Sequence, residues 1–234
     1  MRFLVRQLLS RQIIKVSSVE PLFVLTIGQT PRNDIEKELR QVLGARPIEM
    51  HGALDGLSTE DINQFSPESA ADTFHTHLAN GADVIISKKA VTARLEKILA
   101  TTGSRPVLVA CTGKFSGLAK SHNVLFPSTI LEGVVDAVAP ANCTLGVLVP
   151  LVHQIEPLSQ QWRRPDREVV VAAVKPGEDA SQAAAALARA GVDLVVLDCF
   201  GYETALLSQV RKTTGVPVLS AVRCTAHVAS ELLG

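Results

Sequence analysis

Two cysteines occupy equivalent places in the two halves of the sequence, and their thiols are the groups best suited to chemistry. Cys111 directly follows the apolar run 107–110, and Cys199 follows the run 195–197 after a single aspartate, Asp198. A continuous apolar run of this kind predicts a strand that is buried on both faces. Sites in open α/β sheets lie at the carboxyl ends of such strands. The pattern therefore predicts that the two thiols face one ligand.

The chemistry expected from this pair is proton transfer at carbon without a cofactor or a metal. A free thiol has a pKa near ~8.5, and the amino end of a helix lowers that pKa by stabilising the thiolate. Helix-like segments follow both cysteines, so we expect this effect at each. A thiolate on one side of a substrate carbon removes a proton while a thiol on the other side returns one, which is racemisation or epimerisation. Four backbone N–H groups are predicted to bind a substrate carboxylate, those of Thr112, Gly113, Phe200 and Gly201.

Each of these cysteines also has a purely structural interpretation. Cysteine is among the most buried residue types, and a cysteine at the end of an apolar strand is often a packing residue. Cys143 and Cys224 are not expected in the site, because the first precedes a strand and the second belongs to the last helix. The chain has no C-x-x-C spacing, which argues against a zinc knuckle or a thioredoxin-type pair. Free thiols in a reducing cytoplasm are therefore expected.

The composition excludes several classes of partner. The 234 residues include 23 basic and 23 acidic side chains, so net charge gives no reason to expect binding to nucleic acid or to an anionic membrane. Aromatic residues make up 4% of the chain, too few for base-stacking platforms. No apolar run approaches the ~20 residues that span a bilayer. With a hydrophobic content of 47%, the chain is expected to form a cytoplasmic protein with a substantial core.

Strand-like and helix-like segments alternate along the chain. Strands are predicted at 22–27, 47–51, 82–86, 106–110 and 124–126 in the first half, and at 145–149, 168–174, 193–198 and 217–219 in the second. Such alternation indicates βαβ units with parallel strands and right-handed crossovers. The sequence therefore predicts an α/β fold of two pseudo-symmetric lobes, each a parallel four-stranded sheet flanked by helices.

Local signals add three expectations within the first half. Thr30 is predicted to cap a helix over 31–43, which begins with proline. The segment 66–80 begins with Ser-Pro-Glu-Ser and is predicted to be helical. Lys88 and Lys89 are predicted to lie in an exposed loop.

The predicted lobes are not continuous in sequence. Residues 1–21 are basic and are expected to form a loosely ordered N-terminal extension. The first lobe is predicted to comprise 22–127 together with 222–234, and the second lobe 128–221. A hinge is expected near residue 140, where a Pro-Ala-Asn segment separates the halves.

Four motifs together resemble the AroM protein family. They are LTIGQTPR (25–32), HGALDGLS (51–58), CTGKF (111–115) and LDCFGY (197–202), and the resemblance extends from residue 21 to the end of the chain. The family looks like a branch of the aspartate/glutamate/hydantoin racemase superfamily. The resemblance implies two α/β lobes, a cleft between them and one catalytic cysteine from each lobe, matched here by Cys111 and Cys199. Amino-acid racemases carry Cys-Asn-Thr and Cys-Thr-His motifs, and this chain departs from both after the cysteine.

The resemblance also places substrate-binding residues at the end of the first strand. In the superfamily this end of the first lobe contributes to the site, which here implies roles for Gly28, Gln29, Thr30 and Arg32. Arg32 is suited to clamp a carboxylate bidentately, and the alternative is a surface residue in the first turn of a helix. Tyr202 is expected either to roof the cleft or to pack at a helix start.

Three other polar residues near these motifs have weaker claims to the site. His51 and Asp55 lie in a glycine-containing loop, where a turn role is favoured over a site role. Lys114 is expected to be solvated. The alternative is that its charge lowers the pKa of the Cys111 thiol.

These observations lead to one leading function and two alternatives. The leading hypothesis is a cofactor-independent racemase or epimerase that acts on a small carboxylate or hydantoin-like compound, with Cys111 and Cys199 as acid and base. The first alternative is a small-molecule binding or sensing protein that keeps the cleft without turnover. The second is a lyase or isomerase that uses Cys199 alone. A homodimer is expected because the superfamily commonly forms one.

Overall fold

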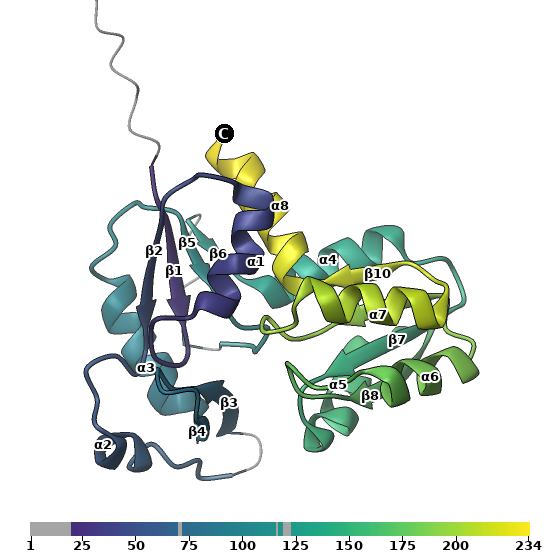
Figure 1. Cartoon of the computed structure of the whole chain (residues 1–234), viewed down its shortest axis with the longest axis horizontal. Helices are drawn as coiled ribbons and strands as arrows, with labels where there is room; N and C mark the ends of the chain where they lie inside the picture. Colours follow the sequence, from purple (N-terminus) through teal and green to yellow (C-terminus); the bar gives the residue numbers. More distant parts are fainter. Residues whose placement is uncertain (1–19, 70–71, 116, 119–122) are drawn as a thin grey trace, which may run out of the picture.

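The computed structural model describes residues 20–69, 72–115, 117–118 and 123–234, and it contains two parallel sheets set side by side (Figure 1). Most of the predicted N-terminal extension, residues 1–19, lies outside the described residues. Within the described part of the chain, no helix combines the length and the apolar character needed to cross a bilayer.

The first sheet is four-stranded and entirely parallel. Its strands, in spatial order, are β2 (Ile48–Gly52), β1 (Leu22–Thr26), β5 (Val107–Val109) and β6 (Val124–Leu125). Every residue of the central strands β1 and β5 is buried, as expected for apolar runs covered on both faces. The helices of this half are α1 (Asn33–Leu43), α2 (Thr59–Asn63) and α3 (Lys88–Leu99).

The second sheet repeats this arrangement with four parallel strands. Its spatial order is β10 (Val218–Ser220), β9 (Leu194–Leu197), β7 (Cys143–Val149) and β8 (Arg167–Ala173). The helices around it are η2 (Val152–Gln154), α5 (Ile155–Trp162), α6 (Ser181–Arg189) and α7 (Thr204–Thr214). The predicted fold of two four-stranded parallel sheets flanked by helices is confirmed.

One hydrophobic core joins the two sheets. It contains residues of both sheets, such as Val24 and Val147, and of three helices, such as Leu39 in α1, Leu131 in α4 (Pro127–Val138) and Ala226 in α8 (Ala221–Leu233). Helix α8 packs against both α1 and α4, and Figure 1 shows α1 and α8 side by side between the sheets. The division into a lobe of 22–127 plus 222–234 and a lobe of 128–221 stays a prediction.

An antiparallel hairpin replaces the helix predicted over 66–80. Strand β3 (Thr73–His77) pairs with β4 (Asp83–Ser87) in a separate two-stranded sheet, beside α2 in Figure 1. The sequence Thr-Phe-His-Thr-His alternates half-buried and buried residues, which is the period-two pattern of a strand. β-Branched and aromatic side chains favour this conformation, and they outweigh the Ser-Pro-Glu-Ser signal before them.

The first helix begins later than its capping signal predicts. Helix α1 starts at Asn33, and Arg32 occupies the N-cap without a side-chain capping bond. Thr30 instead donates from its backbone N–H and its hydroxyl to the carboxylate of Asp55, at 2.7 and 2.9 Å. A tertiary partner therefore takes the side chain that would otherwise cap the helix.

Candidate active site

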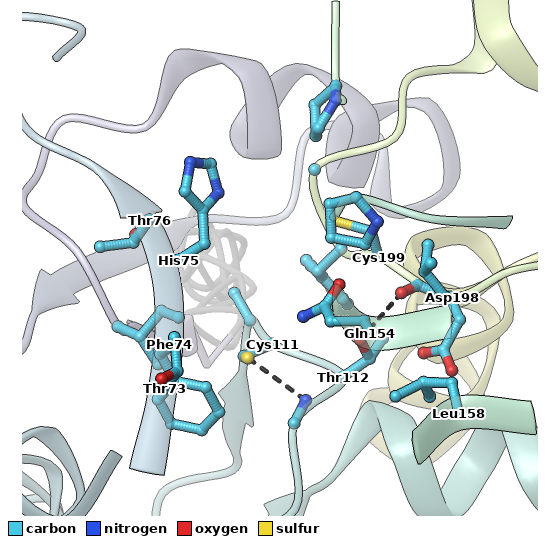
Figure 2. Close-up of a pocket in the computed structure, with 18 of the residues that line it drawn as sticks. Thr73, Phe74, His75, Thr76, Cys111, Thr112, Gln154, Leu158, Asp198 and Cys199 are labelled. Carbon is cyan, nitrogen blue, oxygen red and sulfur yellow. Dashed lines mark hydrogen bonds between the residues drawn. The ribbon is translucent and has the colours of Figure 1, made fainter. Parts of the chain in front are cut away.

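The carboxyl ends of the two sheets form the walls of one cavity of about 520 Å³. The first lobe contributes the residues after β1 and β5 and the whole of β3. The second lobe contributes the residues after β7 and β9, together with η2 and α5. Cys111 and Cys199 both line this cavity, one from each lobe (Figure 2). This location follows from the parallel sheets, since the strands of each sheet end on the same side.

A hydrogen bond joins the two cysteine-bearing loops directly. The Thr112 hydroxyl donates to the backbone carbonyl oxygen of Asp198 at 3.3 Å, shown as a dashed line in Figure 2. Thr112 follows the first cysteine, and Asp198 precedes the second. The bond therefore ties the backbone beside one thiol to the backbone beside the other.

Burial favours the neutral form of the Cys111 thiol. Burial raises its pKa to about 11, against the opposing effects of the Gly113 N–H and the positive charges of Lys88 and Arg32. Gly113 donates its N–H to the Cys111 sulfur at 3.3 Å. We expected a helix to lower this pKa, but residues 110–115 after β5 form no helix, so burial dominates.

Cys199 shows the same behaviour to a greater degree. Burial raises its pKa to about 12, and negative charge on Cys111 and on Asp198 adds to this effect. The Gly201 N–H opposes it as a hydrogen-bond donor. Helix α7 begins only at Thr204, so the predicted helix terminus does not reach this thiol either. Both cysteines therefore carry raised thiol pKa values in the wall of one cavity.

A buried carboxyl group lies immediately before the second cysteine. Asp198 is 5% exposed, and its Oδ2 accepts a hydrogen bond of 2.7 Å from the indole N–H of Trp162, which is itself 1% exposed. Burial raises the pKa of Asp198 to about 6, although the Trp162 bond favours the charged form. The pair fixes the end of α5 to the end of β9 and places a titratable group in the cavity wall.

Five of the nine predicted substrate-binding residues line the cavity. They are Arg32, Thr112, Gly113, Phe200 and Gly201. The guanidinium of Arg32 is already engaged, because Nε and Nη2 donate to the two carboxylate oxygens of Asp34 at 2.9 and 2.6 Å. Its Nη1 is directed to the Thr26 hydroxyl at 3.5 Å. The expected bidentate clamp is thus formed with Asp34 of the chain itself.

The other four predicted residues stabilise structure around the cavity and do not line it. Gln29 donates to the carbonyl oxygens of Leu54 and Leu57, both at 3.2 Å. Gly28 packs so closely against β3 that a Cβ would overlap the Thr76 side chain. The Tyr202 hydroxyl donates to the Val174 carbonyl oxygen at 2.7 Å, in the core of the second lobe.

The remaining named groups also lie away from the cavity or are paired. Asp55 serves the turn after β2, where its Oδ2 also accepts the Gly52 N–H at 2.7 Å. His51 is paired with Glu49 at 2.9 Å. Cys143 is buried at the start of β7, and Cys224 lies half-buried in α8. None of these residues lines the cavity around the two thiols.

The first lobe also contributes residues that the sequence did not single out for the site, among them all of β3 (Thr73–His77). Phe74 and His75 come from β3, and both are labelled among the lining residues in Figure 2. Lys88 also lines the cavity, half-buried at the start of α3, so its predicted place in an exposed loop is wrong. The available signal was the alternating pattern of Thr73–His77, which predicts a strand and brings the following lysine back to the site.

Solved structures with the same fold include three that cover nearly the whole chain. A maleate isomerase from Pseudomonas putida is 16% identical with a TM-score of 0.55, over 92% of this chain and 93% of that one. A glutamate racemase from Bacillus anthracis is 17% identical with a TM-score of 0.58, over 92% and 82%. An arylmalonate decarboxylase is 14% identical with a TM-score of 0.50, over 92% and 93%. At these identities the likeness shows a shared fold.

Sequence comparison gives a more specific result. Curated protein sequences show no significant match to this chain. A family model described as AroM protein matches residues 22–233, which include both sheets and both cysteine loops. The chain therefore belongs to the AroM protein family.

Proposed function

We propose that this protein is a cofactor-independent racemase or epimerase of a small carboxylate or hydantoin-like compound. The observation that carries the proposal is the entry of Cys111 and Cys199 into one cavity from opposite lobes. A carbon centre bound between them exposes one face to each thiol. The shared fold with an isomerase, a racemase and a decarboxylase supports the same class of chemistry.

The proposed reaction balances without any other reactant. The thiolate of one cysteine takes the proton from the substrate carbon and becomes a thiol, and the C–H electron pair stays on carbon. The thiol of the other cysteine donates its proton to the opposite face and becomes a thiolate. The two cysteines exchange protonation states in each turnover, so opposite substrate hands use opposite bases.

The raised thiol pKa values suit this role in one respect and oppose it in another. A thiolate with a pKa of about 11 or 12 is a strong base, better matched to a weakly acidic C–H group than an ordinary thiolate is. The fraction of thiolate at neutral pH is small for the same reason. We propose that cationic cavity residues such as Lys88 favour the thiolate in the working enzyme.

Proton exchange in deuterium oxide tests the proposal. Carboxylates and hydantoins that carry one hydrogen on the central carbon are incubated with the protein, and loss of that proton signal is followed by NMR. The expected result is exchange accompanied by inversion of configuration, abolished by Cys111→Ala and by Cys199→Ala separately. Exchange that survives Cys111→Ala and is lost with Cys199→Ala indicates instead the single-cysteine reaction.

A binding or sensing role is the second candidate, and one observation favours it. Burial raises the pKa of both thiols well above 7, which opposes the action of either as a base. If the protein only binds or senses its ligand, some of these carboxylates or hydantoins bind, as measured by calorimetry, and none exchanges its proton.

A further inference from the structure

Three cationic side chains line the cavity, and two of them are already paired with carboxylates. Arg32 donates to both oxygens of Asp34, as described above. Lys114 lies 3.0 Å from the carboxylate of Glu132. For Lys88, the described part of the chain offers no carboxylate within 4.0 Å of the ammonium nitrogen. Lys88 is therefore the lining cation whose charge is left for another group.

The surroundings of Lys88 hold its charge at the cavity wall. Its Nζ lies 5.1 Å from the centroid of the Phe74 ring, a cation–π contact that fixes the end of the side chain. The nearby carboxylate of Asp72 is used at the start of α3, where it accepts the Lys89 N–H at 2.9 Å. Ser87 caps the same helix by accepting the Ala90 N–H at 3.1 Å.

The same wall leads directly to the first thiol. The Phe74 ring, which makes the cation–π contact with Lys88, packs against Gly113 so closely that a Cβ on Gly113 would overlap the ring. Gly113 donates its N–H to the Cys111 sulfur. Lys88 and Arg32 both act on Cys111 electrostatically, in opposition to the larger effect of burial on its pKa. Lys88 and Cys111 thus line the same cavity, with Phe74 and Gly113 between them.

We propose that Lys88 binds the carboxylate of the cavity's ligand beside Cys111, and that this ligand is therefore an anion. Lys88 is half-buried, and among the described residues no carboxylate is in ion-pair contact with it, so its ammonium gains a charge-assisted hydrogen bond when a ligand carboxylate arrives. That this ligand is a substrate rests on the proposed function, whereas the recognition of an anion does not. The assignment gives to Lys88 the role that the sequence suggested for Arg32.

A pair of alkylating reagents tests this without a known substrate. Iodoacetate and iodoacetamide carry the same reactive carbon, and only iodoacetate carries a carboxylate. In both reactions a cysteine thiolate forms an S–C bond, iodide leaves with the C–I electron pair, and the thiol proton goes to solvent. The ratio of the two rates at Cys111, followed by peptide mass spectrometry, measures anion recognition. Any change in the thiol pKa affects both rates and cancels from the ratio.

The expected ratio in the native protein is about tenfold higher than for the same cysteine in urea, the effect of one charge-assisted contact. Lys88→Met removes this preference, and Lys88→Arg keeps most of it. Lys89→Met is the matched control, because Lys89 is the exposed neighbour on the same helix, and it leaves the ratio unchanged.

Three outcomes overturn the inference. They are a ratio unaffected by Lys88→Met, an equal loss with Lys89→Met, and a Cys111 that neither reagent reaches in the native protein. The exchange experiment is independent of this ratio. A protein that prefers iodoacetate yet exchanges no substrate proton keeps the anion site and loses the racemase function.

Discussion

The Thr112 hydroxyl donates its hydrogen bond to the Asp198 backbone carbonyl oxygen across 3.3 Å, and this contact connects the two cysteine loops of the cavity. Both partners are adjacent in sequence to a cysteine and stand at the end of a strand. The distance between the two thiols is therefore set by short segments anchored in two sheets. A two-base reaction depends on the separation of the two thiols, because a shift of about 1 Å in a reacting group can cost ~100-fold in rate.

Replacement of Thr112 tests how far this contact positions the thiols. Thr112→Val keeps the shape and removes the donor, so the carbonyl oxygen of Asp198 loses its partner. We expect proton exchange to fall at least tenfold while the free energy of unfolding in urea falls by only about 1 kcal/mol. Thr112→Ser retains the hydroxyl and should keep most of the activity. Equal losses in the two variants would show that the methyl group matters and the hydrogen bond does not.

Alkylation of the two thiols by iodoacetamide should depend steeply on pH. Burial raises the pKa of Cys111 to about 11 and that of Cys199 to about 12, so the thiolate fraction of each rises about tenfold per pH unit between pH 7 and 10. Cys111 should react faster than Cys199 throughout this range when peptides are quantified by mass spectrometry. A plateau below pH 9 at either cysteine would contradict the predicted burial effect.

Asp198 should make the protein less stable as pH rises from 4 to 6. Burial raises its folded pKa to about 6 from 3.8, so the folded state binds the proton more tightly than the unfolded state does. The resulting stabilisation is complete below the unfolded pKa and is lost as pH rises through the folded pKa. At about 1.4 kcal/mol per pKa unit, the loss between pH 4.5 and 7 is roughly 2 kcal/mol.

Asp198→Asn is the variant that isolates this effect, since it keeps an acceptor for the Trp162 N–H. The free energy of unfolding is measured in urea at pH 4.5 and at pH 7 for both proteins. Between these two pH values it should fall by roughly 2 kcal/mol more in the wild type than in Asp198→Asn. Parallel pH profiles would mean that Asp198 has an ordinary pKa in the folded protein.

The strands that carry the thiols are predictable from sequence because their signals are local. The runs before Cys111 and Cys199 are apolar and β-branched, and each ends where the polar loop begins. The two four-stranded sheets follow from the same periodicity. The hairpin was predicted only in part: β4 matches the strand predicted at 82–86, but β3 was assigned to a helix, because a short helix-start signal conflicts with the alternation in Thr73–His77 and tertiary packing decides between them.

The electrostatics of the site depend on contacts that no local pattern contains. Trp162 and Asp198 are 36 residues apart, and their bond exists because α5 packs at the end of β9. The expected low thiol pKa values required helices directly after both cysteines, and burial reverses that expectation. Lys88 reaches the cavity only because the hairpin turns the chain back toward it.

A carboxylate on α1 should contribute to stability across the two lobes. Glu38 is 3% exposed, and its Oε2 accepts both the backbone N–H of Thr204 at 3.1 Å and its hydroxyl at 2.6 Å, at the start of α7. Glu38→Ala leaves the Thr204 N–H without this acceptor, while the hydroxyl keeps Gln41 Oε1 at 3.0 Å, and the change should lower the free energy of unfolding by about 1–3 kcal/mol.

Glu36→Ala on the same helix is the matched control for Glu38. Glu36 forms an exposed i,i+4 ion pair with Arg40 at 2.7 Å. The loss of such a pair costs only about 0.3–0.5 kcal/mol. Similar effects of the two substitutions in urea unfolding would argue against a stabilising role for the Glu38–Thr204 contact.

The glycine after the first cysteine should tolerate no side chain. A Cβ on Gly113 would overlap the Phe74 ring and press on the Cys111 sulfur, so Gly113→Ala must displace the ring that supports Lys88. We expect a lower melting temperature and a loss of the iodoacetate preference at Cys111, both measured on the same preparation. Gly133→Ala is the control, because Gly133 lies exposed within α4 with no atom near its Cβ position, and it should stabilise the protein by about 0.5–1 kcal/mol. An unchanged preference in Gly113→Ala would mean that Phe74 does not hold Lys88 in place.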